Sequence, residues 1–317
     1  MNSKHLMALA CAAALTGSVY AAETAAEEEN ETAPQGWNYT PGEGLSYNET
    51  PIVTAEVGLA FDSKFLSYGL VDNNEPILTP SASITFLDWI TFNVESIFDV
   101  SAYGRKKVLN DDGEPEDLYA NRAGKYQELD PGVSLGHAFS PEDYEWLPTT
   151  IEFSIGYMYE YHPRSFNTKS DDTQFITFDI SLPDLWIAPT LSYERDIYRD
   201  DGTYVSLELA HTFEFFDGVF SLTPSIVQGF GNCERVKGYL TNHETGEPLN
   251  HSGLMDSWIK LDAEWALTPW LTLGGYVAYS DYIFDQKMRD AARDYEASGK
   301  WDHSYNFTCG ISVTATF

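Results

Sequence analysis

The chain of 317 residues carries 18 lysines and arginines against 49 aspartates and glutamates, a net charge of −31. This acidic balance excludes nucleic-acid binding, which needs a basic surface, and electrostatic docking on anionic lipid. No apolar run approaches the roughly 20 residues of a membrane-spanning helix. Aromatic residues nevertheless make up 15% of the chain. The fold must therefore accommodate a large apolar surface without a membrane-spanning helix.

The first 21 residues have the organisation of a secretory signal peptide. A short polar start precedes an apolar stretch over 6–15, which is too short to span a bilayer, and small residues stand at both ends of 19–21, as a cleavage site requires. Cys11 leaves a lipoprotein signal open, but it lies early and is better explained as part of the apolar stretch. Residues 1–21 are therefore predicted to be a signal peptide removed on export.

Residues 22–50 form an acidic segment with few aliphatic side chains. Such a segment cannot bury enough apolar area to order itself, so we expect a disordered tail on the periplasmic side. Two cysteines remain beyond the leader, Cys233 in a predicted loop and Cys309 in the last predicted strand. We therefore predict neither a disulfide nor a cysteine metal site.

From residue 51 to residue 317 the chain alternates apolar and polar residues in blocks separated by turn residues. Weak repeats of this kind are typical of an all-β fold, the transmembrane antiparallel up-and-down β-barrel. The connections alternate between short turns and long polar loops, which in such barrels lie at the periplasmic and extracellular ends, respectively. We predict about 12 strands, with approximate spans 52–65, 77–86, 90–100, 127–139, 149–161, 174–182, 186–197, 203–215, 219–229, 256–267, 271–281 and 303–317.

The last predicted strand shows the clearest alternation, with the apolar positions of 305–317 on one face and an aromatic residue at the end. It resembles the C-terminal strand of bacterial outer-membrane barrels, which the barrel-assembly machinery recognises. The resemblance implies an outer-membrane location, with outer-membrane lipid and the assembly machinery as partners and Phe317 as part of the assembly signal. A soluble secreted β-sandwich would also alternate, but it would need neither the terminal Phe nor alternating connection lengths.

Four tryptophans lie at the short-turn end of the predicted strands: Trp89, Trp146, Trp186 and Trp270. An aromatic girdle is expected where a barrel wall meets the lipid headgroups. The proposed outward face also carries no formal charge through its middle, where a Lys or Arg would cost about 2–4 kcal/mol. Both features favour a wall that faces lipid.

The opposite face of the predicted strands is polar and strongly acidic, with Lys64 and Lys260 as its only confident cations. A ring of carboxylates attracts cations and repels anions. Alternatively, these carboxylates only solvate the wall and accept hydrogen bonds from Tyr and Ser neighbours. The predicted pore-lining residues are Glu56, Asp62, Glu95, Asp99, Glu152, Glu160, Asp179, Glu194, Asp196, Glu208, Asp262 and Glu264, with Glu128 and Asp130 on the same face.

The strand count limits how open the interior can be. Eight strands are filled by side chains and 16–18 leave a channel, so about 12 strands lie between these cases. Trp258, Tyr276 and Tyr204 are predicted to point inward. Residues 285–298 predict a short helix before the last strand, and it would either cap the mouth or, as we favour, lie solvated on the surface.

The histidines and the acidic loop show no pattern of a catalytic or metal site. His137 and His211 are predicted to face lipid at the periplasmic interface, away from the outer leaflet where a lipid A-modifying enzyme needs its site. The remaining histidines have no recognisable ligand spacing: His162, His243, His251 and His303. The acidic loop 110–117 leaves Ca²⁺ binding open, but it lacks the EF-hand spacing, and a solvated loop is the better interpretation.

The first predicted hairpin loosely resembles that of TorF-like porins, a family of proteobacterial barrels that also end in an aromatic strand. The family's arginine before the glycine is absent, because Ser67 and Tyr68 stand there. The resemblance implies a porin of unknown substrate. The residues that carry it are Ser63, Lys64, Phe65, Gly69, Asn73, Asn74, Pro76 and Pro80.

The sequence thus predicts an outer-membrane porin-like channel for passive diffusion of small solutes, with a carboxylate-rich lumen that favours cations. We expect no enzymatic activity, no cofactor, no metal and no nucleic-acid partner, and the oligomeric state stays open. The first alternative is a non-conducting barrel that serves surface binding or scaffolding. The second is an outer-membrane lipid-modifying enzyme.

Overall fold

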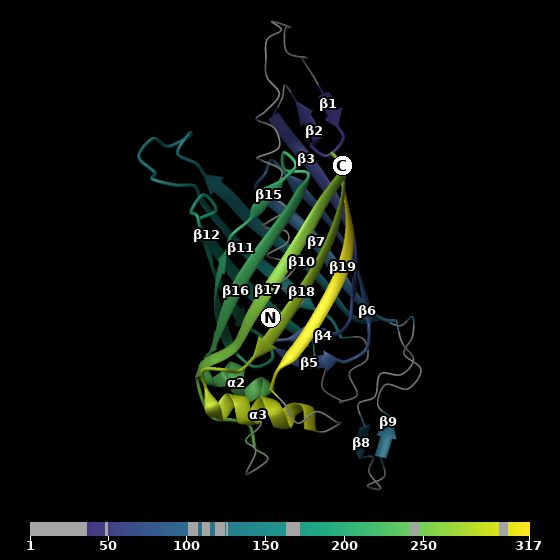
Figure 1. Ribbon diagram of the computed structural model, residues 1–317, viewed down its shortest axis with the longest axis vertical. Coiled ribbons are helices and arrows are strands. Elements are labelled where there is room, and N and C mark those ends of the chain that lie inside the picture. The colour runs from purple at the N-terminus through teal and green to yellow at the C-terminus, as the bar shows by residue number, and fades with distance from the viewer. Residues whose placement is uncertain are drawn as a thin grey trace, which may run out of the picture.

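Twelve strands form a closed antiparallel barrel in which each strand pairs with the next barrel strand along the chain and β19 pairs with β3 (Figure 1). The computed structural model describes residues 37–47, 50–100, 107–109, 115–117, 124, 126–162, 172–240, 242, 247–297 and 304–317. The barrel strands are β3 (Thr50–Asp62), β6 (Ile77–Phe86), β7 (Ile90–Asp99), β10 (Tyr126–Phe139), β11 (Ile151–Glu160), β12 (Thr173–Ser181), β13 (Ala188–Asp196), β14 (Thr203–Ala210), β16 (Phe220–Gly231), β17 (Gly253–Thr268), β18 (Leu271–Asp281) and β19 (Asn306–Thr316). The predicted all-β, up-and-down barrel is confirmed.

Each predicted strand has a counterpart, and one of them is interrupted. The span 203–215 divides into β14 and β15 (Phe213–Phe215), although both pair with β16 in one continuous register. The break lies opposite Pro224, whose carbonyl accepts from the backbone N of His211 at 3.2 Å. Since proline has no N–H, it cannot return the second hydrogen bond of the ladder.

A hairpin precedes the barrel, at the end where the C-terminus lies (Figure 1). It consists of β1 (Trp37–Thr40) and β2 (Gly44–Tyr47), and β2 pairs with the start of β3. The expectation of a disordered tail over 22–50 is therefore wrong for this part, because β2 provides partners for backbone groups of β3. The predicted signal peptide, residues 1–21, lies outside the described residues.

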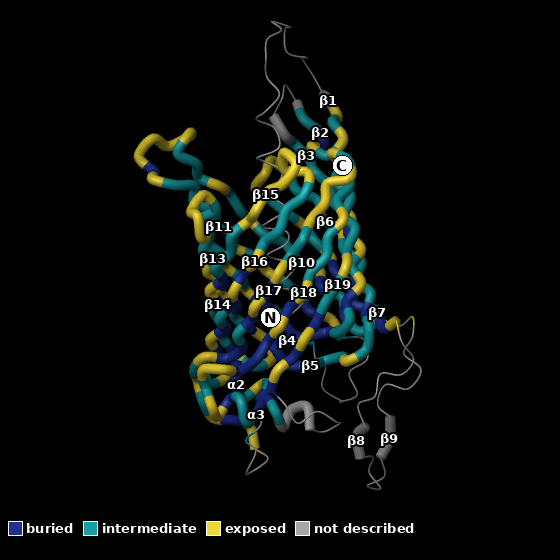
Figure 2. The backbone as a smooth tube through the Cα atoms, in the orientation of Figure 1, coloured by how far each residue is buried: buried dark blue, intermediate teal, exposed yellow. Residues whose placement is uncertain are grey.

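The outward face of the wall is apolar and exposed. Ile259 and Ile311 in the strands are 63% and 67% exposed, and Trp146 and Trp186 at the short-turn end are 78% and 73% exposed. Figure 2 shows exposed and less exposed positions alternating along the strands, with buried positions gathered in the half near α2 and α3. Among the described residues, no helix is long and apolar enough to cross a membrane.

Within the described residues, the long-loop end carries two helices and two hairpins. The helices are α2 (Cys233–Tyr239) and α3 (Gln286–Ala297), and the hairpins are β4 (Phe65–Ser67) with β5 (Leu70–Asn73) and β8 (Lys107–Leu109) with β9 (Pro115–Asp117). Helix α3 matches the helix predicted over 285–298. Its Met288, Ala291 and Ala292 are buried in a core with Tyr68 and Leu70, so α3 caps the mouth and the favoured solvated surface helix is wrong.

Candidate functional site

The predicted pore-lining carboxylates divide into two groups along the barrel axis. Those in the half near α2 and α3 are buried: Asp62, Glu95, Asp99, Glu160, Glu194, Asp196 and Glu208, together with Glu128 and Asp130. Those toward the short-turn end are half-buried or, for Glu264, exposed: Glu56, Glu152, Asp179, Asp262 and Glu264. Water therefore reaches the acidic face mainly from the short-turn end.

The hairpin β4–β5 lies inside the mouth of the barrel and packs against the wall. Phe65 forms a buried cluster with Ile77 and Ile97. Leu66 forms another with Trp258 on β17 and with two residues of β16 and β18, Val227 and Ala278. These apolar residues occupy inward positions on the strands, and this exception to the polar face was the only sequence signal of a hairpin seated inside.

Hydrogen bonds hold the tip and the open end of this hairpin. The Tyr282 hydroxyl donates to the backbone O of Tyr68 at 2.5 Å, and Asn306 Nδ2 donates to the backbone O of Gly69 at 3.0 Å. The Tyr68 hydroxyl donates to Glu194 on the opposite wall, and Asn73 Nδ2 donates to Asp99 Oδ1 at 2.5 Å. The hairpin therefore bridges the lumen between distant strands.

Arg235 on α2 places a buried positive charge in the mouth. Its guanidinium is fully buried, 3.2 Å from Glu194 and 3.7 Å from Asp200, and donates to the Tyr68 hydroxyl at 3.1 Å. Burial by itself would lower the pKa of Arg235, but Tyr68, Glu194 and other neighbours raise it above its ordinary value. The group therefore stays charged and joins α2, β13 and the hairpin in one network.

Helix α3 is fastened by ion pairs at its first turns. Asp285 Oδ1 accepts from the backbone N of Lys287 and Met288 at 3.0 and 3.2 Å, and Asp285 Oδ2 lies 2.7 Å from His251 Nε2. Arg289 Nη2 lies 3.1 Å from Asp281 Oδ2 at the end of β18. These contacts hold α3 across the mouth.

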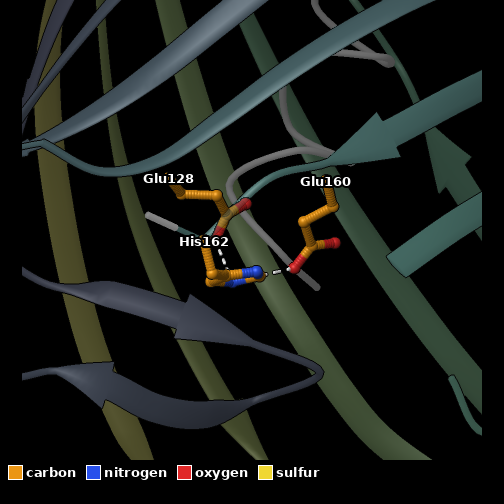
Figure 3. A group of neighbouring side chains, drawn as sticks. All are labelled: Glu128, Glu160 and His162. Carbon is orange, nitrogen blue, oxygen red and sulfur yellow. Dashed lines mark ion pairs between the residues drawn. The ribbon is translucent and has the colours of Figure 1, made fainter. Parts of the chain in front are cut away.

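A group of three potential metal ligands lies on the wall of the mouth. His162 Nε2 lies 3.1 Å from Glu128 Oε2 and 3.2 Å from Glu160 Oε1, and Figure 3 shows the three side chains pointing toward one another. The bridge between Leu129 and Tyr161 sets Glu128 opposite His162. The spacing of these residues in the sequence gave no sign of the group, because only the pairing of neighbouring strands brings Glu128 to the other two residues.

The other histidines that the structure describes make packing contacts or ion pairs with neighbouring side chains. His137 stacks on Trp89 with ring centroids 4.0 Å apart, and His211 packs on Trp186 at 5.0 Å, both within the predicted girdle. His243, His303 and most of the loop 110–117 lie outside the described residues. The expectations of no enzymatic activity and of no Ca²⁺ site in that loop therefore stay predictions.

Comparisons with known proteins give matches to solved structures. Neither a family model nor a curated protein matches the chain, so the resemblance to TorF-like porins has no support there. The NanC porin covers 82% of this chain and 98% of its own at 10% identity and a TM-score of 0.42. Outer membrane phospholipase A from Escherichia coli covers 83% and 92% at 13% identity and a TM-score of 0.40. OprB of Pseudomonas putida covers 84% and 93% at 10% identity and a TM-score of 0.35. At these identities and TM-scores the likenesses add nothing to the fold that the strand pairing establishes.

Proposed function

We propose that this chain is a porin-like channel of the outer membrane that lets small solutes, preferentially cations, diffuse passively through a narrowed mouth. The observation that carries the proposal is a closed barrel with an exposed apolar outside and a carboxylate-lined inside. It needs no cofactor and is not an enzyme. Its partners are outer-membrane lipid and the solutes that pass.

The outside of the barrel supports the membrane location. Exposed apolar side chains cover the strands, and exposed tryptophans gather at the short-turn end, as expected for a wall between two headgroup layers. Phe317 exchanges backbone hydrogen bonds of 2.8 and 2.9 Å with Ala55 and so completes the seam with β3. We propose that the barrel-assembly machinery recognises this terminal strand.

The charge of the interior supports a preference for cations. The cations on the inner side of the described part of the chain include Lys260, 3.6 Å from Asp262, and Arg235, held by Glu194 and Asp200. The many carboxylates on the same face outnumber them, and a lumen of one sign concentrates ions of the other sign.

The inward hairpin supports a limit on solute size. Its apolar side chains and the core beneath α2 and α3 narrow the mouth, while Glu264 near the short-turn end stays exposed. Passage would therefore be controlled at the mouth and selectivity would be set along the acidic wall.

Planar-bilayer recording in a KCl gradient tests the proposal. We expect a small conductance whose reversal potential has the sign of K⁺ permeation, and a larger conductance with the same sign when residues 66–72 are replaced by Gly-Gly. Glu264→Gln should weaken the preference for K⁺, whereas Glu43→Gln, in the exposed turn between β1 and β2, should leave it unchanged. Anion preference in either barrel would contradict the proposal.

The second candidate is a non-conducting barrel, which the buried core of the mouth favours. The same bilayer recordings distinguish the channel from the non-conducting barrel. A silent native protein whose Gly-Gly variant conducts would establish the plugged barrel and reject passive diffusion. A variant that is also silent would reject a continuous path altogether.

A further inference from the structure

We infer that Glu128, Glu160 and His162 form a binding site for a divalent transition-metal ion, of which Zn²⁺ is the representative. The three donor atoms lie within 4.8 Å of one another. They come from β10, from the end of β11 and from the residue two places after it, and the three side chains point toward one another (Figure 3). The inference concerns ion binding and does not rest on conduction.

The spacing of the donor atoms fits a tetrahedral ion. Zn²⁺ binds imidazole nitrogen and carboxylate oxygen at about 2.0–2.2 Å, so neighbouring ligand atoms of a tetrahedron stand roughly 3.4 Å apart. Nε2 of His162 lies 3.1 and 3.2 Å from its two carboxylate partners. All three donor atoms lie within 4.8 Å of one another, so the side chains would draw together around the ion, with Nε2 of His162 free of its proton.

The surroundings hold these donors in place. The side chains of Glu128 and Glu160 are 3% and 8% exposed, whereas that of His162 is 21% exposed. The backbone N of His162 donates to Asp172 Oδ1 at 2.8 Å, and the Tyr159 hydroxyl donates to Asp172 Oδ2 at 2.8 Å. The two carboxylates are thus buried in the wall, and the backbone of His162 is fixed beside them.

The donor set selects the class of ion. One imidazole nitrogen and two carboxylate oxygens suit Zn²⁺ and related transition metals. Ca²⁺ and Mg²⁺ prefer sites made entirely of oxygen, with six or more ligands. The buried Asp130 and Glu95, which face each other across β10 and β7, add negative charge near the site and favour cations over anions there.

Isothermal titration of the folded, chelator-treated protein in detergent tests the site. We expect one Zn²⁺ per chain and no comparable binding of Ca²⁺ or Mg²⁺. His162→Ala and Glu160→Gln should each weaken Zn²⁺ binding at least about tenfold. Two matched controls should bind as the native chain does: Glu152→Gln, a luminal carboxylate at the other end, and His251→Ala, a histidine of another loop. Absent binding, or binding unchanged by both site variants, would overturn the inference.

The absorption spectrum of bound Co²⁺ provides a second test of the site, so that the conclusion does not depend on a single variant. Co²⁺ held by one nitrogen and two oxygens in a tetrahedral site absorbs visible light far more strongly than aqueous Co²⁺, so the native chain should develop these bands and the site variants should not. Heat-modifiable gel mobility establishes that each variant is folded. If His162→Ala does not fold, the nearly isosteric Glu160→Gln decides the outcome, and unchanged bands in that variant would reject the site.

Discussion

At the tip of the β4–β5 hairpin, Gly69 combines a left-handed backbone with a close approach to the wall. Its φ is +77°, and a Cβ placed on it would lie 2.8 Å from Cβ of Asp256. Gly69→Ala therefore meets two penalties, a left-handed alanine at about 1–2 kcal/mol and a collision with β17. We expect the hairpin to lose part of its docking, seen as faster hydrogen exchange over residues 65–73.

Gly218→Ala is the matched control, because Gly218 has φ +81° and no atom within 4 Å of the added Cβ. It carries the backbone penalty without the collision, in a turn at the opposite end of the barrel. Exchange over 65–73 should stay at the native level in this variant. Equal exchange in the two variants would show that the hairpin does not depend on the fit of Gly69.

At the scale of single residues, the sequence predicted the direction of side chains better than their partners. The alternation of apolar and polar residues was sufficient to place Glu194 and Glu128 on the inner face, because successive side chains of a strand point to opposite faces. It could not pair Glu128 with His162, since that contact depends on the register of β10 against β11. Nor could it join Arg235 to Glu194, because Arg235 lies on a helix in a loop that carries no periodic signal.

At the scale of elements, α3 depends on Asp285, which caps its first turn and pairs with His251. Asp285→Ala should remove both interactions and destabilise the helix by about 1 kcal/mol. Asp285→Asn should keep the cap and lose only the charge. Hydrogen exchange across residues 286–293 measures both effects, and equal losses in the two variants would show that the cap contributes nothing.

The same residue gives α3 a dependence on pH. Burial alone would raise the pKa of Asp285, but the hydrogen bond from His251 and the backbone N–H of Met288 outweigh it and lower the pKa below 3.8. A lowered pKa means that the stabilisation is present above the unfolded value and is lost as pH falls through the folded value. We expect the native chain to lose protection of α3 below about pH 4 more steeply than Asp285→Asn does. If the native chain and Asp285→Asn lost protection of α3 equally as the pH falls, the proposed role of the Asp285 charge would be contradicted.

The elements of the wall were predictable, whereas those of the mouth were not. β6 and β18 have the bounds that alternation predicted, because a strand with an apolar outward face and a polar inward face must repeat every two residues. The hairpin β4–β5 and helix α2 are too short to show a period. Their positions follow from apolar contacts with Trp258 and Met255, which exist only after the barrel has closed.

At the scale of the whole molecule, an apolar exterior and an acidic interior follow from the same alternation. A one-residue slip of any strand would exchange the two faces and place carboxylates on the apolar exterior. The closed ring of pairings, completed by β19 and β3, fixes that register for all strands together. The net charge of −31 is therefore compatible with an apolar exterior, because many of the carboxylates lie on the inner face of the barrel.

The proposal that the exposed apolar exterior faces lipid predicts a cost for charge that depends on depth. Ile259, in the middle of β17, is 63% exposed, whereas Leu185, in the short turn between β12 and β13, is 43% exposed. In lipid, Ile259→Arg should cost about 2–4 kcal/mol and Leu185→Arg about 0–1 kcal/mol, because the penalty falls toward the headgroups. Urea titration of folding into phospholipid vesicles measures both. A small, equal cost at the two positions would place the wall in water and reject the membrane location, since an aqueous surface accepts arginine at either height.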